Sequence, residues 1–150
     1  MFKHILVPID GSSTSLLAID KAAGLAKAFG SKVTALYVID PYPFTGVGAD
    51  FALGQDQYLG AAKAEAGAAM EAASQRLQQA GVAAETSVVE AHAVWRGIQE
   101  TADRLGADLL VIGSHGRRGL EKLVLGSVTQ SVLSHTRITT LVVRREPASA

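Results

Sequence analysis

Apolar runs and helical stripes alternate along the whole chain. Five short apolar runs have the character of strands buried on both faces. They lie at Ile5–Ile9, Val33–Ile39, Val82–Val89, Asp108–Gly113 and Ile138–Arg144. Stripes with helical period separate them, at Ser13–Phe29, Tyr58–Ala80, His92–Leu105 and Ser127–His135. This alternation predicts an α/β fold with a doubly wound, mostly parallel five-stranded sheet and helices on both faces.

The strand order follows from how such sheets are wound. The chain runs outward from the first strand and then crosses back, so the first and fourth strands become neighbours with a crevice between their carboxyl ends. The predicted order is therefore 3-2-1-4-5, Rossmann-like or flavodoxin-like. A length of 150 residues with no linker predicts a single domain over residues 1–150.

One segment interrupts this regular pattern. Residues Asp40–Gln57 contain two prolines and three glycines, and they predict a long loop after the second strand. Such a loop could cover a ligand at the carboxyl edge of the sheet. A disordered insert or a dimer contact explains the composition equally well.

The fourth strand runs directly into a glycine pattern. Gly113-Ser-His-Gly116 is followed after nine residues by Gly126-Ser127. We expect Gly113 and Gly116 to take positive φ and bring their N–H groups close to a ligand. Ser127 is expected to cap a helix whose face is shared by Val128, Val132 and His135. Free amides and the helix dipole at such a start attract a phosphate.

The first strand supplies the other wall of the crevice. Asp10 follows it, and its carboxylate either accepts a hydrogen bond from a ligand or only shapes the turn. Pro8 and Val38 add apolar surface, so the crevice suits a base, a sugar and phosphates. In the glycine loop, Arg117 could pair with phosphate oxygens or lie solvated.

Composition removes several classes of function. Lys plus Arg equals Asp plus Glu, at 14 each, so no basic field is present to hold a nucleic acid. A chain without Cys has no disulfide and no thiolate metal site, which suits a cytoplasmic protein. The first apolar run is too short for a signal peptide, and no run approaches a membrane span.

Known catalytic and nucleotide motifs are also missing. No GxxxxGK[ST] motif occurs, and the turn after the first strand lacks GxGxxG. No nucleophile–base pair or HExxH-like ligand cluster appears in the sequence. Any metal would therefore be Mg²⁺ or a similar ion carried on the phosphates of the ligand.

These residues resemble the universal stress protein family over essentially the whole chain. The matching segments are residues 5–12, 35–38, 108–117 and 119–128. The family's ATP-binding pattern is GxxG, nine residues, then Gly with Ser or Thr, and this chain keeps every position. One departure is Thr139-Thr140, where the family often has Pro-Val before the last strand.

The resemblance implies that the ligand is ATP, ADP or AMP, and it indicates which residues would contact that ligand. Pro8, Asp10 and Val38 would lie near the base, and the fourth-strand end would meet the ribose and phosphates. The remaining expected contacts are Ile112, Gly113, Gly116, Arg117, Gly126, Ser127 and Val128. The resemblance also implies a homodimer through the last strand, and the apolar edge Leu141–Val143 agrees with this.

Three functions remain open at this point. The favoured one is a nucleotide-responsive regulatory protein of the stress response. A slow ATPase or adenylyl-transferring enzyme is weaker, because Asp10–Ser15 departs from the SGGxDS that such enzymes carry. A phosphoacceptor receiver domain would need clustered carboxylates and a late lysine, and only Asp10 fits.

Overall fold

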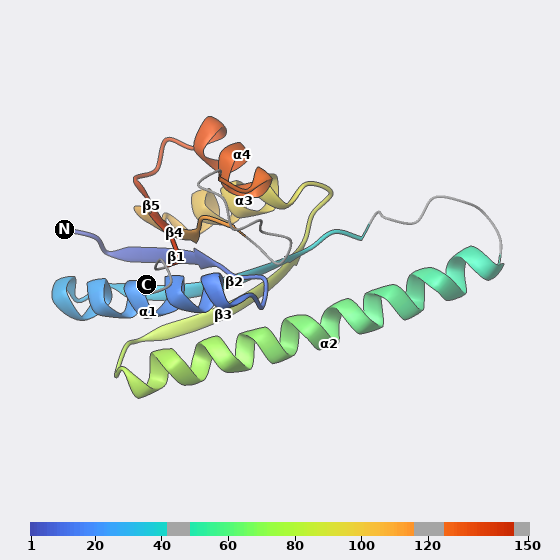
Figure 1. Cartoon of the computed structure of the whole chain (residues 1–150), viewed down its shortest axis with the longest axis horizontal. Helices are drawn as coiled ribbons and strands as arrows, with labels where there is room; N and C mark the ends of the chain where they lie inside the picture. The colour runs from blue at the N-terminus through green and yellow to red at the C-terminus, as the bar shows by residue number, and fades with distance from the viewer. Residues whose placement is uncertain (42–48, 116–124, 146–150) are drawn as a thin grey trace, which may run out of the picture.

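A five-stranded parallel sheet forms the centre of the computed structural model, which describes residues 1–41, 49–115 and 125–145. Its order is β3-β2-β1-β4-β5 (Figure 1). The strands are β1 (His4–Pro8), β2 (Lys32–Ile39), β3 (Ala84–Glu90), β4 (Leu109–Gly113) and β5 (Thr140–Val143). All pairings are parallel, so the predicted fold class and strand order are confirmed.

Two helices cover each face of the sheet (Figure 1). They are α1 (Ser13–Phe29), α2 (Ala49–Gln79), α3 (Val94–Leu105) and α4 (Ser127–His135). The pair α1 and α2 packs on one face, and α3 and α4 pack on the other. Among the described residues, no helix is both long enough and apolar enough to cross a membrane.

Alternation of side chains along the strands divides the interior into two cores. Ile5 and Val7 face α1 and α2, and both are fully buried. Leu6, between them, is buried on the opposite face against Ile98 of α3 and Val132 of α4. Successive residues of a strand point to opposite faces, so a continuous apolar run is what a sheet covered on both sides requires.

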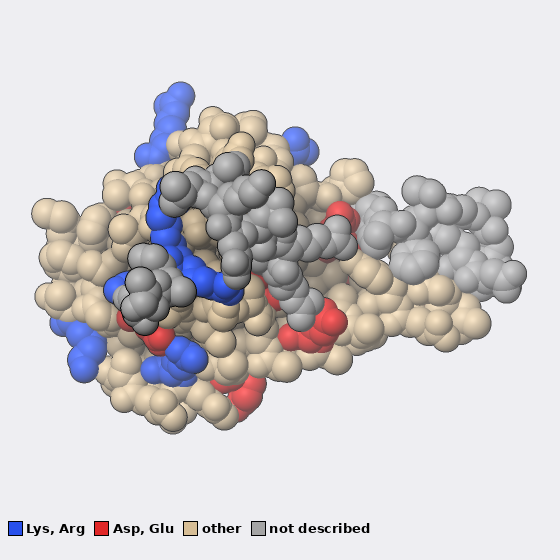
Figure 2. All heavy atoms as spheres, in the orientation of Figure 1, with Lys and Arg blue, Asp and Glu red and all other residues tan. Residues whose placement is uncertain are grey.

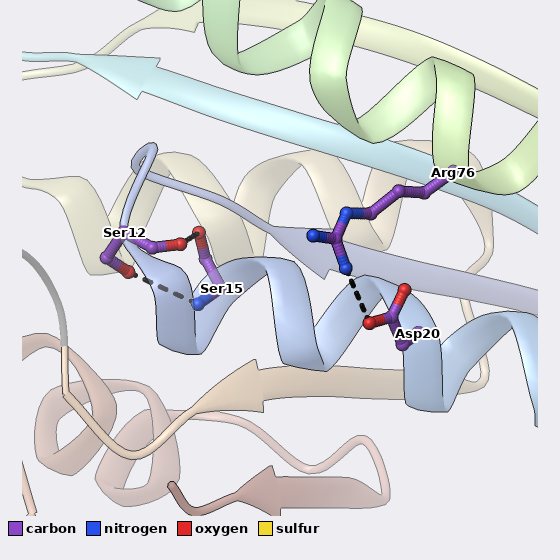
Figure 3. Close-up of polar contacts among 4 residues, drawn as sticks. All are labelled: Ser12, Ser15, Asp20 and Arg76. Atoms are coloured by element: carbon purple, nitrogen blue, oxygen red, sulfur yellow. Dashed lines mark hydrogen bonds and ion pairs between the residues drawn. The ribbon is translucent and has the colours of Figure 1, made fainter.

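Capping residues determine where α1 begins and ends, and an ion pair attaches it to α2. Ser12 caps the helix, because its Oγ accepts a hydrogen bond of 3.2 Å from the N–H of Ser15 (Figure 3). Gly30 ends it in the left-handed conformation, with φ of 68°. Asp20 forms a 2.6 Å ion pair with Arg76, which joins α1 to α2 across the surface.

The expected loop at Asp40–Gln57 is wrong over its second half. Helix α2 begins at Ala49, so residues 49–57 are helical, whereas residues 42–48 lie outside the described part. Gly54 costs only about 1 kcal/mol in a helix, and Ala, Leu and Gln around it are good helix formers. Tyr58 donates a 3.1 Å hydrogen bond to the carbonyl of Asp40, which ties the helix to the end of β2.

At the amino edge of the sheet, one carboxylate joins β1 to the start of β4. Asp108 accepts hydrogen bonds of 2.9 to 3.1 Å from the backbone N–H groups of Lys3 and His4. Partial burial raises the pKa of Asp108, but these backbone hydrogen bonds outweigh it and lower the pKa below its ordinary value. The ionised form is therefore the one that stabilises the fold.

We expect Asp108→Asn to lower the free energy of unfolding by about 1 kcal/mol at pH 7, a modest value because the group is partly exposed. A carboxylate whose pKa is lowered in the folded state stabilises above its unfolded pKa and loses that effect as pH falls through its folded pKa. Urea unfolding at pH 7 and pH 3 checks this. The loss should shrink at pH 3, and the exposed control Asp103→Asn should show none. An equal loss at both pH values would contradict the role of the charge.

Candidate functional site

The two central strands separate toward their carboxyl ends. The ladder between β1 and β4 contains only Ile5–Leu109 and Leu6–Leu110, although β1 continues to Pro8 and β4 to Gly113. Pro8 has no N–H to donate, and β1 stays attached to β2 through Ile9 N–H and the carbonyl of Leu36, at 2.8 Å. Meanwhile β4 stays paired with β5. The divergence lies at the switch point where open α/β sheets bind ligands.

Asp10 shapes the turn that leaves β1. Its Oδ1 accepts a 2.9 Å hydrogen bond from the N–H of Ser12, and Gly11 takes a φ of 84°. The turn-forming role of Asp10 is therefore present in the structure. A hydrogen bond that the Asp10 carboxylate accepts from a ligand stays a prediction.

Val38 is held in place by a residue that the sequence analysis did not select. It is half-buried near the end of β2, and α3 packs directly on it. A Cβ built at Gly97 would lie 2.9 Å from Val38 Cγ1 and 2.9 Å from Ala91 Cβ. Gly97 therefore allows α3 to approach the apolar wall. The sequence signal that could have indicated Gly97 is a glycine inside a helical stripe with no cap role.

The expected reason for Gly113 is wrong. Its φ is not positive, and it continues β4 in register with Val143 of β5. A Cβ there would lie 2.9 Å from Thr14 Cγ2, so glycine is needed because α1 crosses the strand end closely. The side chain of Ile112, another predicted site residue, is only 5% exposed and packs in the core against α3 and α4. Contact between Ile112 and a ligand would have to come through its backbone.

Two hydrogen bonds hold the start of α4 against the end of β4. Gly126 N–H donates to the carbonyl of Ser114 at 2.7 Å, and Thr129 Oγ1 donates to the carbonyl of Gly113 at 2.7 Å. Both ends of the predicted glycine loop are thus fastened together. Gly116 and Arg117, two other predicted contacts, lie outside the described residues.

The cap of α4 is Gly126, so the prediction for Ser127 is wrong by one position. Gly126 has extended backbone, with φ of −64° and ψ of 158°, and no side chain of the described residues caps the helix. Ser127 is the first helical residue, and its N–H and that of Val128 make no hydrogen bond to the described part of the chain. These amides have the properties of an anion site.

The buried face of α4 also differs from the expected one. Thr129 and Val132 face the core, whereas Val128 is 36% exposed and His135 is exposed. The hydrogen bond of Thr129 to the end of β4 sets this rotation of the helix. As a result, Ser127 and Val128 are accessible to a ligand rather than packed beneath the helix.

Aromatic side chains join the other end of α4 to α3. The rings of Trp95 and His135 stack with centroids 3.9 Å apart and planes at 16°. An open hollow of about 370 Å³ lies here, and it contains none of the predicted site residues. The contact therefore packs α3 against α4 away from the candidate site.

Charged side chains offer no alternative centre on the face that Figure 2 presents. Basic and acidic residues are interspersed there on a largely uncharged surface. Within the described ranges, no group of three or more His, Asp or Glu residues could hold a metal ion. The divergent ends of β1 and β4 and the start of α4 therefore form the candidate site.

Known proteins of similar sequence have the same fold. The model of the universal stress protein family matches residues 1–144. A universal stress protein of Methanocaldococcus jannaschii is 34% identical over 145 residues, which cover 97% of this chain and 84% of that protein. The universal stress protein UspA of Lactobacillus plantarum has a TM-score of 0.80 at 26% identity, covering 95% of this chain and 97% of that one. A universal stress protein solved in complex with cAMP has a TM-score of 0.71 at 27% identity, covering 97% and 98%.

Proposed function

Because this chain belongs to the universal stress protein family, we propose that it binds an adenine nucleotide, with ATP as the expected ligand, and acts as a regulatory protein of the stress response. The observation that carries the proposal is the start of α4. Its first amides, at Ser127 and Val128, lack partners in the described chain, and the preceding Gly126 is hydrogen-bonded to Ser114 at the end of β4. A phosphate chain supplies the oxygens that such amides bind.

The opposite side of the crevice supports the same ligand. Val38 and Pro8 offer apolar surface for a base, and Asp10 offers a carboxylate in the turn beside them. A relative of similar fold and 27% identity was solved with cAMP, which has an adenine base, a ribose and a phosphate. Mg²⁺, if it takes part, would be held mainly by the phosphates. A cytoplasmic location is part of the proposal.

Isothermal titration of the protein with ATP, ADP, AMP and cAMP tests the binding claim, with GTP as the control for the base. We expect at least one adenine nucleotide to bind with one site per chain and GTP to bind more weakly. Absence of binding by all four adenine nucleotides would contradict the proposal. Mass spectrometry of small molecules retained during purification would identify the natural ligand.

A regulatory role also predicts little or no turnover. Phosphate release from ATP should stay far below about 1 per second, since no group of three or more His, Asp or Glu in the described part of the chain could hold a catalytic metal ion. Faster release that disappears on Ser127 substitution would favour an ATPase instead.

We further propose a homodimer through β5. This strand is the last in the sheet and pairs only with β4 among the described strands, and its Leu141 is 40% exposed. An open apolar edge favours pairing with another strand. We expect Leu141→Lys to shift the protein from dimer to monomer in sedimentation experiments. Leu133→Lys is the matched control, because Leu133 is 39% exposed but lies on α4. A dimer that survives Leu141→Lys would contradict the strand pairing.

A further inference from the structure

The amino-terminal half of α2 extends beyond the rest of the fold. Figure 1 shows this helix continuing past the carboxyl ends of the strands. The helix begins at Ala49, yet the first of its described side chains to be buried is that of Ala66. Residues 52–65 are exposed or half-buried. A helical segment this short has marginal stability in water without packing, so a partner that covered it would stabilise it.

One face of this protruding segment is exposed and uncharged. Leu53, at 60% exposure, is the most exposed large apolar side chain of the described chain after Met1. Gln57, Gly60 and Ala64 follow it at intervals of four, three and four residues, and all are exposed. This is the spacing of the a and d positions of a heptad, along which two helices pack. No described atom lies within 4 Å of a Cβ built at Gly60, so a second backbone can approach closely there.

Two opposite charges flank the same edge of this face. Asp56 and Lys63 are exposed and lie seven residues apart, so both occupy the g position of the heptad. They are too far apart to pair within one helix, where side-chain pairs join residues three or four apart. Neither forms an ion pair with a residue that the structure describes. The e positions on the other edge, Gly54 and Ala61, carry no charge.

These charges favour one orientation of a helix pair. In a parallel pair, the g edge of one helix meets the e edge of the other, where Asp56 and Lys63 would meet no charge. In an antiparallel pair, the two g edges meet each other. One antiparallel register brings Leu53 against Ala64 of a second copy. The same register sets Asp56 of each copy beside Lys63 of the other, so the segment is complementary to itself.

We infer that α2 pairs in antiparallel orientation with α2 of a second copy of this chain, through the face that contains Leu53 and Gly60. Two reciprocal ion pairs between Asp56 and Lys63 fix the register, and a two-fold axis relates the copies. A contact this short falls below the roughly 1,200 Å² that stable interfaces bury, so the association is weak and reversible. It depends on neither the proposed nucleotide site nor the β5 edge.

The contact lies on a different side of the molecule from the proposed dimer interface. Helix α2 packs on β2 and β3, whereas β5 is the strand at the opposite edge of the sheet. One copy can therefore use both surfaces at once. Pairing through α2 would join two β5 dimers at high protein concentration and leave them separate at low concentration.

Sedimentation equilibrium from about 10 μM to about 1 mM tests the pairing, with Leu141→Lys as the background that removes the β5 contact. We expect this variant to be a monomer at the lowest concentration and to approach the dimer mass at the highest. Adding Asp56→Lys or Lys63→Asp should weaken the association at least about tenfold, because both ion pairs become repulsive. Combining the two should restore it to within about threefold, since opposite charges meet again.

A matched control and a check on folding accompany these variants. Asp103→Lys makes the same change of charge at an exposed position of α3 and should leave the association unchanged. Circular dichroism of each variant shows whether α2 stays helical. The charge-swap result is specific to contact between copies, because Asp56 and Lys63 do not meet within one helix.

Three results would overturn the inference. The first is a mass that stays constant over the whole range in both the wild type and Leu141→Lys. The second is association that Asp56→Lys leaves unchanged. The third is association that the single reversals weaken but the double reversal does not restore. Each of these would leave the proposed nucleotide binding untouched, because that claim is tested by titration with nucleotides.

Discussion

Saturating ATP is expected to raise the melting temperature of the protein by about 5 to 11 °C. A ligand that binds only the folded state, at about 100 times its dissociation constant, adds roughly 2.7 kcal/mol to the free energy of unfolding. For a domain of this size, each kcal/mol corresponds to about 2 to 4 °C. Differential scanning fluorimetry over a series of ATP concentrations measures the shift, which should grow with the logarithm of concentration above saturation.

Replacing Ser127 by Glu should remove most of that shift. Ser127 is exposed at the first position of α4, so a carboxylate there is tolerated by the free protein and even favoured by the helix dipole. The same carboxylate would repel phosphates and occupy their place. Ser134→Glu is the matched control: it adds the same charge at another exposed position of α4, about two turns away. A full ATP shift in Ser127→Glu would contradict phosphate binding at this helix start.

Opposite changes in stability are expected from the same substitution at two helical glycines. Gly97→Ala should lower the free energy of unfolding by about 1 to 3 kcal/mol, because its Cβ would lie 2.9 Å from both Val38 Cγ1 and Ala91 Cβ. Gly67→Ala should raise it by about 0.5 to 1 kcal/mol, since nothing lies within 4 Å of the added atom. Urea unfolding of both variants measures the difference. Equal effects would show that helix propensity, rather than packing on Val38, decides the outcome.

The Gly97→Ala and Gly67→Ala variants also test the apolar wall that Val38 forms in the candidate site. Displacing Val38 should weaken binding of adenosine as well as ATP, because a base contact does not depend on phosphates. In contrast, Gly67→Ala should leave both affinities unchanged. The pattern differs from that expected for Ser127→Glu, which acts on ATP and spares adenosine. Together, the variants distinguish contacts to the base of the ligand from contacts to its phosphates.

Strong and regular signals in the sequence predicted the architecture. Runs such as Leu109–Ile112 and cap signals such as Gly30 depend on local chemistry that tertiary contacts do not overturn. The start of α2 was missed because Ala49–Gln57 has no apolar period and contains Gly54. The segment becomes helical by extension of an existing helix, which costs less than starting one.

Local sequence could not reveal close contacts between distant elements. Gly113 was selected because a positive φ was expected there, whereas the structure shows the close approach of Thr14 from α1. The rotation of α4 depends on the hydrogen bond of Thr129 to a carbonyl 16 residues earlier. Gly97 of α3 was missed for the same reason, because its neighbour Val38 lies on β2, far away in the sequence. Such contacts depend on three-dimensional packing.

The stack between Trp95 and His135 gives the protein an optical property. The chain has one tryptophan, so its tryptophan emission comes from a single place, the contact between α3 and α4. The far end of α4 is where phosphates are proposed to bind. Any ligand that tilts this nine-residue helix alters the distance between indole and imidazole and so changes the emitted light. Tryptophan fluorescence can therefore test, without an attached dye, whether the proposed nucleotide moves α4.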